Sequence, residues 1–173
     1  MITKHSSRIF LVDDDAIFLR ALEHHLSHHL KFNLHTSKIS SGEECLKKLR
    51  LKPCIVVLDY HLNGTKPDAM NGIDVLKEIK KTDPELIVIM LSSQDRLEIA
   101  VDTMKYGAFD YVTKNESAFT RIENAINNSV RTIYLADELN KYKRGKWMAI
   151  AFLILIIGTS ILLQVFFPSL FDK

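Results

Sequence analysis

The sequence predicts an α/β fold: a five-stranded, doubly wound parallel sheet followed by a single C-terminal transmembrane helix. Two observations predict it. Short apolar runs alternate five times with helical patterns, and residues 147–167 form an uncharged stretch near the end of the chain. Alternating strands and helices are typical of a parallel sheet whose right-handed crossovers place helices on both faces.

Composition and charge exclude several classes of protein. The chain has 173 residues, 47% hydrophobic and 25% charged, which suits one globular domain with an appendage. Its net charge of +2 gives no basic footprint, so we expect no nucleic-acid partner. Cys45 and Cys54 lack metal-binding or redox spacing and are expected to be free thiols.

The first two strand–helix units occupy the N-terminal 50 residues. The apolar run 8–12 predicts a strand, and 16–30 has apolar residues at helical spacing. Residues 31–39 alternate loosely, which indicates a second strand. The segment 41–49 opens with a serine and has glutamates in its first turn, as helix starts do.

The remaining units follow the same alternation. Strands are expected over 54–59, 85–93 and 108–114; the first two are continuous apolar runs, which suit strands buried on both faces. Helices are expected over 72–82, over 95–107 with Asp95 as cap and Gly107 as stop, and over 118–144, which contains neither glycine nor proline.

Polar residues follow four of the five predicted strands. They are Asp13, Asp14, Asp59, Ser92 and Lys114. The carboxyl ends of parallel strands meet at one edge of an open sheet, where ligands bind. Clustered carboxylates repel one another, and Mg²⁺ relieves that repulsion while also binding phosphate oxygens. With a lysine and a hydroxyl nearby, the set predicts phosphoryl chemistry.

Residues 8–131 resemble the CheY-like receiver domain of bacterial two-component response regulators. The matching stretches are FLVDDD, VVLDYHL, MNGIDVLKEIK, VIMLSS and MKYGAFDYVTK. The resemblance implies phosphorelay signal transduction, in which a sensor histidine kinase or phosphotransfer protein supplies the phosphoryl group. It also implies a switch rather than an enzyme that acts on a separate substrate.

The same resemblance implies a function for each matching residue. Asp59 would be the phospho-acceptor. Asp13, Asp14 and Asp59, with the backbone carbonyl of His61, would hold Mg²⁺. The remaining residues would contact the phosphoryl group: Lys114 and Ser92 bind it, Tyr111 swings inward behind Ser92, and His61 and Gln94 flank it.

The chain departs from the family's pattern at two places. The segment between Asp59 and Gly72 is longer than usual, and the extra residues lie in 63–69, NGTKPDA. A plain surface insertion is the simplest interpretation. In addition, Asn115 stands where the family commonly has a proline, so we expect an ordinary trans bond after Lys114.

Two other functions and one further candidate metal site fit parts of the sequence. A haloacid-dehalogenase-like phosphatase would use Asp13 as nucleophile and Asp15 as acid, but it leaves Asp59 without a function. A docking scaffold could use the receiver fold without phosphorylation. The run HHLSHH at 24–29 has metal-compatible i, i+4 pairs but no evident further ligand, so a solvated helix face is expected.

The C-terminal stretch 147–167 has the length of a membrane span. Its 21 residues would form a helix about 31 Å long, close to the ~30 Å of a bilayer core. Basic residues concentrate before the stretch, which predicts a single-pass protein of the bacterial inner (cytoplasmic) membrane with its main domain in the cytoplasm.

The expected organisation therefore has four parts. They are a receiver domain (1–131), a helical juxtamembrane linker (132–146), the transmembrane helix (147–167) and a short non-cytoplasmic tail (168–173). Output would pass to an unknown membrane-associated protein by direct contact. Pairing of two linkers would give a homodimer, although the heptad pattern there is weak.

Overall fold

We describe the protein from a computed structural model of the full chain. The structure describes residues 8–30, 35–62, 69–94 and 96–166, although the side chains of 134, 136, 137, 140 and 160–166 lie outside the described set. The chain divides into two compact units, 1–133 and 134–173, and each is treated by itself.

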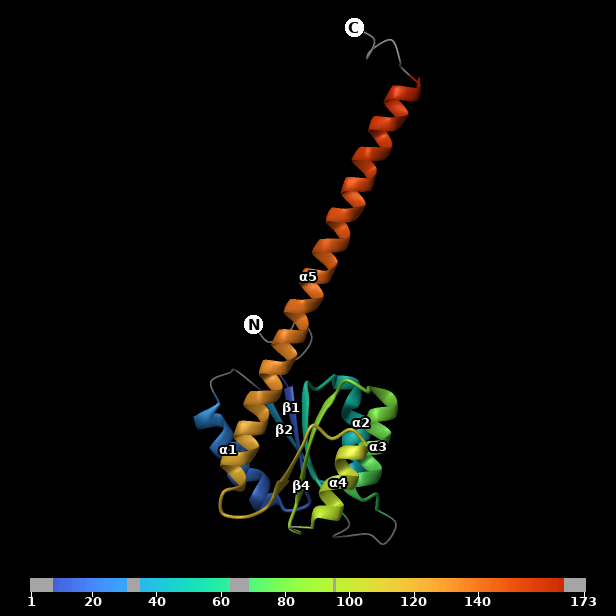
Figure 1. The fold of residues 1–173 in the computed structure, drawn as a ribbon. Coiled ribbons are helices and arrows are strands. Elements are labelled where there is room, and N and C mark those ends of the chain that lie inside the picture. The colour runs from blue at the N-terminus through green and yellow to red at the C-terminus, as the bar shows by residue number, and fades with distance from the viewer. Residues whose placement is uncertain (1–7, 31–34, 63–68, 95, 167–173) are drawn as a thin grey trace. The chain divides into compact units, whose positions relative to one another are not determined.

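The first unit is built on a five-stranded parallel sheet (Figure 1), as the sequence predicts. The strands are β1 (Arg8–Val12), β2 (His35–Ile39), β3 (Ile55–Asp59), β4 (Ile87–Ser92) and β5 (Asp110–Thr113). Their order is β2-β1-β3-β4-β5, so the chain moves outward from β1 in one direction and then in the other. The strand order reverses between β1 and β3, and ligands of doubly wound sheets bind at this point.

Helices cover both faces of the sheet (Figure 1). They are α1 (Ala16–His29), α2 (Gly42–Lys48), α3 (Gly72–Thr82), α4 (Leu97–Lys105) and α5 (Ala118–Phe166). One core joins alternate strand residues such as Ile9 and Val57 to α1 and to the first turns of α5. The other joins residues such as Phe10 and Val56 to α2 and α3. Because strand side chains alternate, each inner strand is buried on both faces.

Side-chain caps fix the start of three helices. Asp15 accepts hydrogen bonds from two backbone N–H groups of α1, Ser41 accepts one from Glu44, and Asn71 accepts one from Asp74. The helix α4 begins after Arg96, which makes no side-chain capping bond. The predicted cap, Asp95, lies outside the described residues.

Other element boundaries differ by a few residues from the predicted ones. The strand expected over 31–39 is β2 from His35 onward, and 31–34 lie outside the described residues. The helix expected over 41–49 changes after Lys48 into a 3₁₀ turn, η1 (Leu49–Leu51), which Lys52 ends at φ +50°. The insertion at 63–69 also falls outside the described residues except for Ala69. No cis peptide bond occurs in the described backbone, as expected at Asn115.

The helix expected over 118–144 is confirmed, and α5 continues beyond it without a break, from Ala118 to Phe166. Its residues up to Ile133 belong to the first unit, and the rest belong to the second. Within the described residues, no helix has both the length and the apolar character that crossing a membrane requires. The predicted span 147–167 is therefore not supported there, and its side chains from 160 onward are outside the described set.

Candidate functional site

The predicted polar residues meet at the carboxyl edge of the sheet. Asp13 follows β1, Asp59 ends β3, Ser92 ends β4 and Lys114 follows β5. Backbone hydrogen bonds hold these strand ends together, since the Lys114 N–H donates to the Ser92 carbonyl at 2.7 Å. The Asp13 N–H donates to the Ile39 carbonyl at 3.1 Å. The site therefore lies on rigid strand ends at the point where the strand order reverses.

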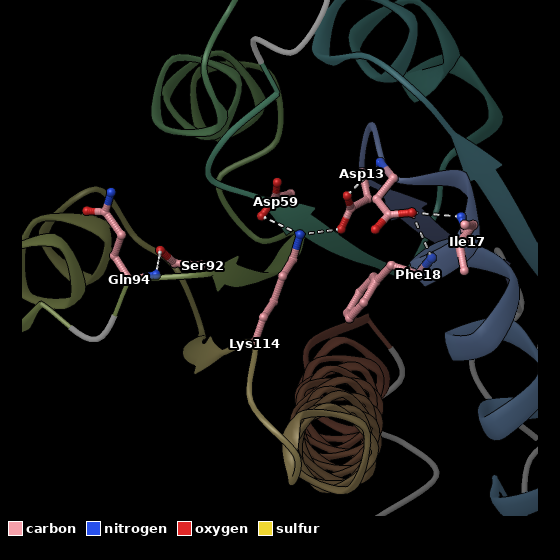
Figure 2. A network of polar contacts seen from close by, with 8 residues as sticks. Asp13, Ile17, Phe18, Asp59, Ser92, Gln94 and Lys114 are labelled. Atoms are coloured by element: carbon pink, nitrogen blue, oxygen red, sulfur yellow. Dashed lines mark hydrogen bonds and ion pairs between the residues drawn. The ribbon is translucent and has the colours of Figure 1, made fainter.

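Lys114 reaches between two buried carboxylates (Figure 2). Its Nζ lies 2.7 Å from Asp13 Oδ2 and 3.0 Å from Asp59 Oδ1. Asp13 and Asp59 are only 1% and 2% exposed. Among the described residues, Asp13 Oδ2 and Asp59 Oδ1 have no hydrogen-bond partner apart from these contacts with Lys114. The ion pairs offset part of the cost of burying two like charges.

Burial is the main influence on the ionisation of Asp59. It raises the pKa of this carboxyl from 3.8 to about 6, against the opposing effect of Lys114 and with added repulsion from Asp13 and Asp14. Burial alone would lower the pKa of Lys114, but its hydrogen bond to Asp13 and the charges of both aspartates outweigh burial and raise it. Lys114 is therefore a permanent cation beside a carboxylate that is unusually ready to bind a proton or another cation.

The three consecutive aspartates have different environments. Asp13 is buried, whereas Asp14 and Asp15 are exposed. The Asp15 Oδ1 accepts hydrogen bonds from the backbone N–H groups of Phe18 at 3.1 Å and Ile17 at 2.8 Å, and these lower its pKa. Asp15 is thus the cap of α1, and a carboxylate with a lowered pKa is a poor general acid. The capping role and lowered pKa of Asp15 disfavour the phosphatase alternative, which requires Asp15 as a general acid.

Ser92, Gln94 and Tyr111 form a linked group beside the carboxylates. Ser92 is fully buried, and its hydroxyl accepts a hydrogen bond from the Gln94 N–H at 3.1 Å (Figure 2). Tyr111 is half-buried and donates its hydroxyl to the Gln94 carbonyl at 2.6 Å. The loop after β4 is therefore held by one side chain from β4 and one from β5.

The segment after β3 places His61 and Gly72 next to Asp59. His61 is exposed, and its ring makes an edge contact with Tyr60. A Cβ on Gly72 would lie 2.1 Å from the Asp59 carbonyl oxygen and 2.7 Å from Tyr60 Cα. Only glycine therefore allows the first turn of α3 to pack against the backbone of the acceptor candidate.

Phe18 is a site residue that the helical spacing of apolar residues over 16–30 does not identify. Its ring lies beneath the Lys114 ammonium, 4.7 Å from Nζ to the ring centroid (Figure 2). It also packs edge-on against Phe119 of α5. A cation over an aromatic face is stabilised, so Phe18 helps to hold Lys114 in place. The spacing of Phe18 in α1 carried no signal of this contact.

Asp13, Asp14 and Asp59 fit a magnesium ion. One carboxylate oxygen from each lies within 4.8 Å of the others, and two of the three residues are buried. The donor set is all oxygen, which suits Mg²⁺, and the exposed side near Asp14 leaves room for metal-bound water. Among the described residues, Lys114 is the only partner of Asp13 Oδ2 and Asp59 Oδ1.

Comparison with known proteins agrees with this geometry. Residues 9–127 match the family described as response regulator receiver domain. The chemotaxis protein CheY of Thermotoga maritima is 32% identical over 118 residues, covering 68% of this chain and 92% of that protein. The transcriptional regulator NtrC of Escherichia coli is 32% identical over 124 residues, but the match spans only 25% of its length.

Solved structures show the same fold. The receiver domain of NtrX from Brucella abortus has a TM-score of 0.63 at 29% identity, covering 72% of this chain and 98% of that domain. A signal receiver domain from Vibrio parahaemolyticus, of a LuxO repressor protein, has a TM-score of 0.67 at 23% identity and supports the fold alone. The matched residues lie within the first compact unit, which holds every site residue described above.

Proposed function

Because the chain belongs to the response regulator receiver family of two-component systems, whose domains accept phosphoryl groups, we propose that Asp59 is its phospho-acceptor. The observation that carries this proposal is the Lys114 ammonium, ion-paired at once with Asp13 and Asp59 at the edge of the sheet. That arrangement supplies a buried nucleophilic carboxylate, a second carboxylate for a cation and a fixed positive charge.

In the proposed reaction, an Asp59 carboxylate oxygen attacks phosphorus of a phosphohistidine on a histidine kinase or phosphotransfer protein. The new O–P bond forms as the N–P bond breaks, and the donor histidine takes up a proton. Magnesium at Asp13, Asp14, Asp59 and the His61 carbonyl would neutralise charge on the phosphoryl oxygens. Burial raises the pKa of Asp59, so its carboxylate becomes the dominant form only above about pH 6 unless a cation is present.

Lys114, Ser92 and Tyr111 are the residues proposed to respond to the phosphoryl group. Lys114 already lies 3.0 Å from Asp59 Oδ1, so it can exchange a carboxylate for a phosphoryl oxygen by a small movement. Turning of the Ser92 hydroxyl toward the phosphoryl group would break its bond with the Gln94 N–H. Because Tyr111 is bonded to the same residue, a change at Ser92 would reach β5 and α4 through Gln94.

The direct test is labelling of the full chain with acetyl phosphate and Mg²⁺. We expect an acid-stable, base-labile phosphoryl group on the wild type and none on Asp59→Asn. Asp110→Asn is the matched control, because Asp110 begins β5, at the end of that strand away from Lys114. Labelling of the Asp59→Asn chain at the wild-type level would overturn the assignment.

A second part of the proposal concerns position in the cell. We propose that residues 147–167 confine the domain to the bacterial inner membrane, where the phosphorylated face would contact a membrane-associated output protein. The support is the uncharged sequence and its exposed apolar side chains, among them Trp147, Phe152 and Leu155. Confinement would raise the effective concentration of the switch near its partner.

Fractionation tests the membrane part independently of phosphorylation. We expect the full chain to sediment with membranes and to resist extraction by salt and alkali, whereas a chain ending at residue 146 should be released. A full chain recovered in the supernatant would contradict the anchor but leave the Asp59 assignment intact.

A further inference from the structure

Two histidines of α1 and a glutamate of α5 form a cluster apart from the aspartate site. One ligand atom from each of His25, His29 and Glu123 lies within 4.8 Å of the others. We propose that this cluster is a binding site for a Zn²⁺ ion that joins α1 to the first turns of α5. The sequence around the histidine pair does not reveal this carboxylate ligand, because Glu123 lies 98 positions from His25.

The distances suit a tetrahedral ion. His25 Nε2 lies 3.1 Å from Glu123 Oε2. Two ligand atoms at zinc bonding distance in a tetrahedron are about 3.3 Å apart, so this pair needs almost no movement. His29 stands one turn further along α1, with its ring stacked on that of His25 at a centroid distance of 4.1 Å. The His29 side chain is exposed, so it can rotate to bring a ring nitrogen to bonding distance from an ion held by His25 and Glu123.

Hydrogen bonding leaves Nε2 of His29 free to serve as a ligand. Its Nδ1 lies 2.8 Å from the His25 backbone oxygen. A carbonyl oxygen can only accept, so Nδ1 carries the hydrogen, and the neutral ring keeps its lone pair on Nε2. Backbone carbonyls orient many metal-binding histidines in this way. For His25, metal binding would replace the Nε2 hydrogen that now faces Glu123, and Nδ1 would take up a proton so that the ring stays neutral.

Packing holds the other two ligands in position. His25 and Glu123 side chains are each 20% exposed, and the His25 ring lies 5.6 Å from that of Phe119. All three ligands belong to the first compact unit. Two nitrogens and one carboxylate leave a fourth position for water. Imidazole ligands favour Zn²⁺ over Mg²⁺, which the all-oxygen aspartate site prefers.

The chain contains its own control for this site. His24 and His28 form a second i, i+4 pair on α1, with rings 4.3 Å apart. Both are exposed, and no carboxylate joins them in a cluster among the described residues. If the histidine spacing alone bound zinc, the two pairs would be equivalent. If Glu123 completes the site, only the pair His25 and His29 should matter.

The test is a Zn²⁺ titration of the full chain, purified without a polyhistidine tag and stripped of metal. Excess Mg²⁺ is added to occupy the aspartate site. We expect one zinc equivalent bound by the wild type. Affinity should fall about tenfold or more in His25→Ala, His29→Ala and Glu123→Gln, and by less than about twofold in the double variant His24→Ala/His28→Ala.

Two further readouts guard against misfolding and surface binding. Far-UV circular dichroism of each variant checks that the chain is folded, and the absorption spectrum of bound Co²⁺ reports tetrahedral coordination. Absence of a zinc equivalent in the wild type would overturn the proposal. So would an unchanged affinity in Glu123→Gln, or an equal loss in the control pair.

Discussion

At the scale of single residues, Asp59 makes the stability of the metal-free protein depend on pH. Burial raises its pKa to about 6 from 3.8, so the folded chain holds this proton more tightly than the unfolded chain. Stability from this group is present below pH 4, is lost as pH rises through the interval up to about 6, and stays lost above it. The cost at neutral pH is the energy of ionising a buried carboxyl.

Asp59→Asn should remove that pH dependence. Relative to the wild type, we expect the variant to gain roughly 2 kcal/mol in free energy of unfolding between pH 4 and pH 7. Urea unfolding in a chelating buffer at both pH values measures the gain, and added Mg²⁺ should reduce it. Parallel stability profiles of the two proteins would show that Asp59 titrates normally.

Lys114 stabilises the metal-free site because its positive charge offsets the negative charges of the two buried carboxylates. In Lys114→Met, Asp13 and Asp59 lose their shared cation, and we expect a loss of about 3 kcal/mol at pH 7. Saturating Mg²⁺ should restore part of it, because the ion binds the folded chain. Chemical denaturation with and without Mg²⁺ measures both effects.

Lys105→Met is the matched control for that variant. Lys105 also pairs with an aspartate, Asp102, at 3.4 Å, but its side chain is 69% exposed. Exposed ion pairs contribute little, so a change within about 0.5 kcal/mol is expected, with no response to Mg²⁺. Equal losses in the two lysine variants would mean that burial of the charges is unimportant.

At the scale of elements, the start of α3 is the tightest junction near the site. Gly72→Ala would bring a Cβ to 2.1 Å from the Asp59 carbonyl oxygen. The nearest atoms all belong to the backbone of Asp59 and Tyr60, which cannot move aside as a flexible side chain could. We expect a loss of more than about 2 kcal/mol and weaker labelling at Asp59. Thermal unfolding and acetyl phosphate labelling measure the two effects.

Gly145→Ala is the opposite case on α5. A Cβ at Gly145 meets no atom within 4 Å, and alanine favours helix more than glycine by about 1 kcal/mol. We therefore expect an unchanged or slightly more helical protein with full labelling. A loss of labelling in Gly145→Ala as large as in Gly72→Ala would contradict the junction argument.

Element order was predictable because local patterns and long-range packing agree in this chain. Apolar runs such as 54–59 are buried on both faces, and the sequence around α3 places its start at Gly72 and its end at Thr82. The 3₁₀ turn at Leu49–Leu51 was not predictable, because Lys52 adopts positive φ without being glycine. Tertiary packing, rather than local sequence, sets such an ending.

The site was predictable only where it depends on strand ends. Parallel strands bring Asp13, Asp59 and Lys114 to one edge whatever their separation in sequence. No comparable rule predicts from sequence which residues of two helices will touch. The ring of Phe18 beneath Lys114 and the carboxylate of Glu123 beside His25 depend on how α1 and α5 pack against each other. No periodicity in a single segment records that packing.

At the scale of the whole molecule, the first unit should fold without the second. Sheet, site and both cores lie within residues 1–133, so a chain ending at Ile133 should keep its stability within about 0.5 kcal/mol and its labelling at Asp59. A chain ending at residue 117 should not fold, because it lacks buried α5 residues such as Ile122 and Ile126. Circular dichroism and thermal unfolding of the two fragments test this; failure of the longer one would contradict it.

The lysine between the two aspartates also bears on the order of events after synthesis. Many small metal-binding proteins remain unfolded until their ion arrives, since nothing else compensates their ligands. Here Lys114 belongs to the chain itself and places its positive charge against both Asp13 and Asp59. We therefore expect a newly made chain to fold before it meets magnesium, so that loss of the metal would inactivate the proposed switch without unfolding the protein.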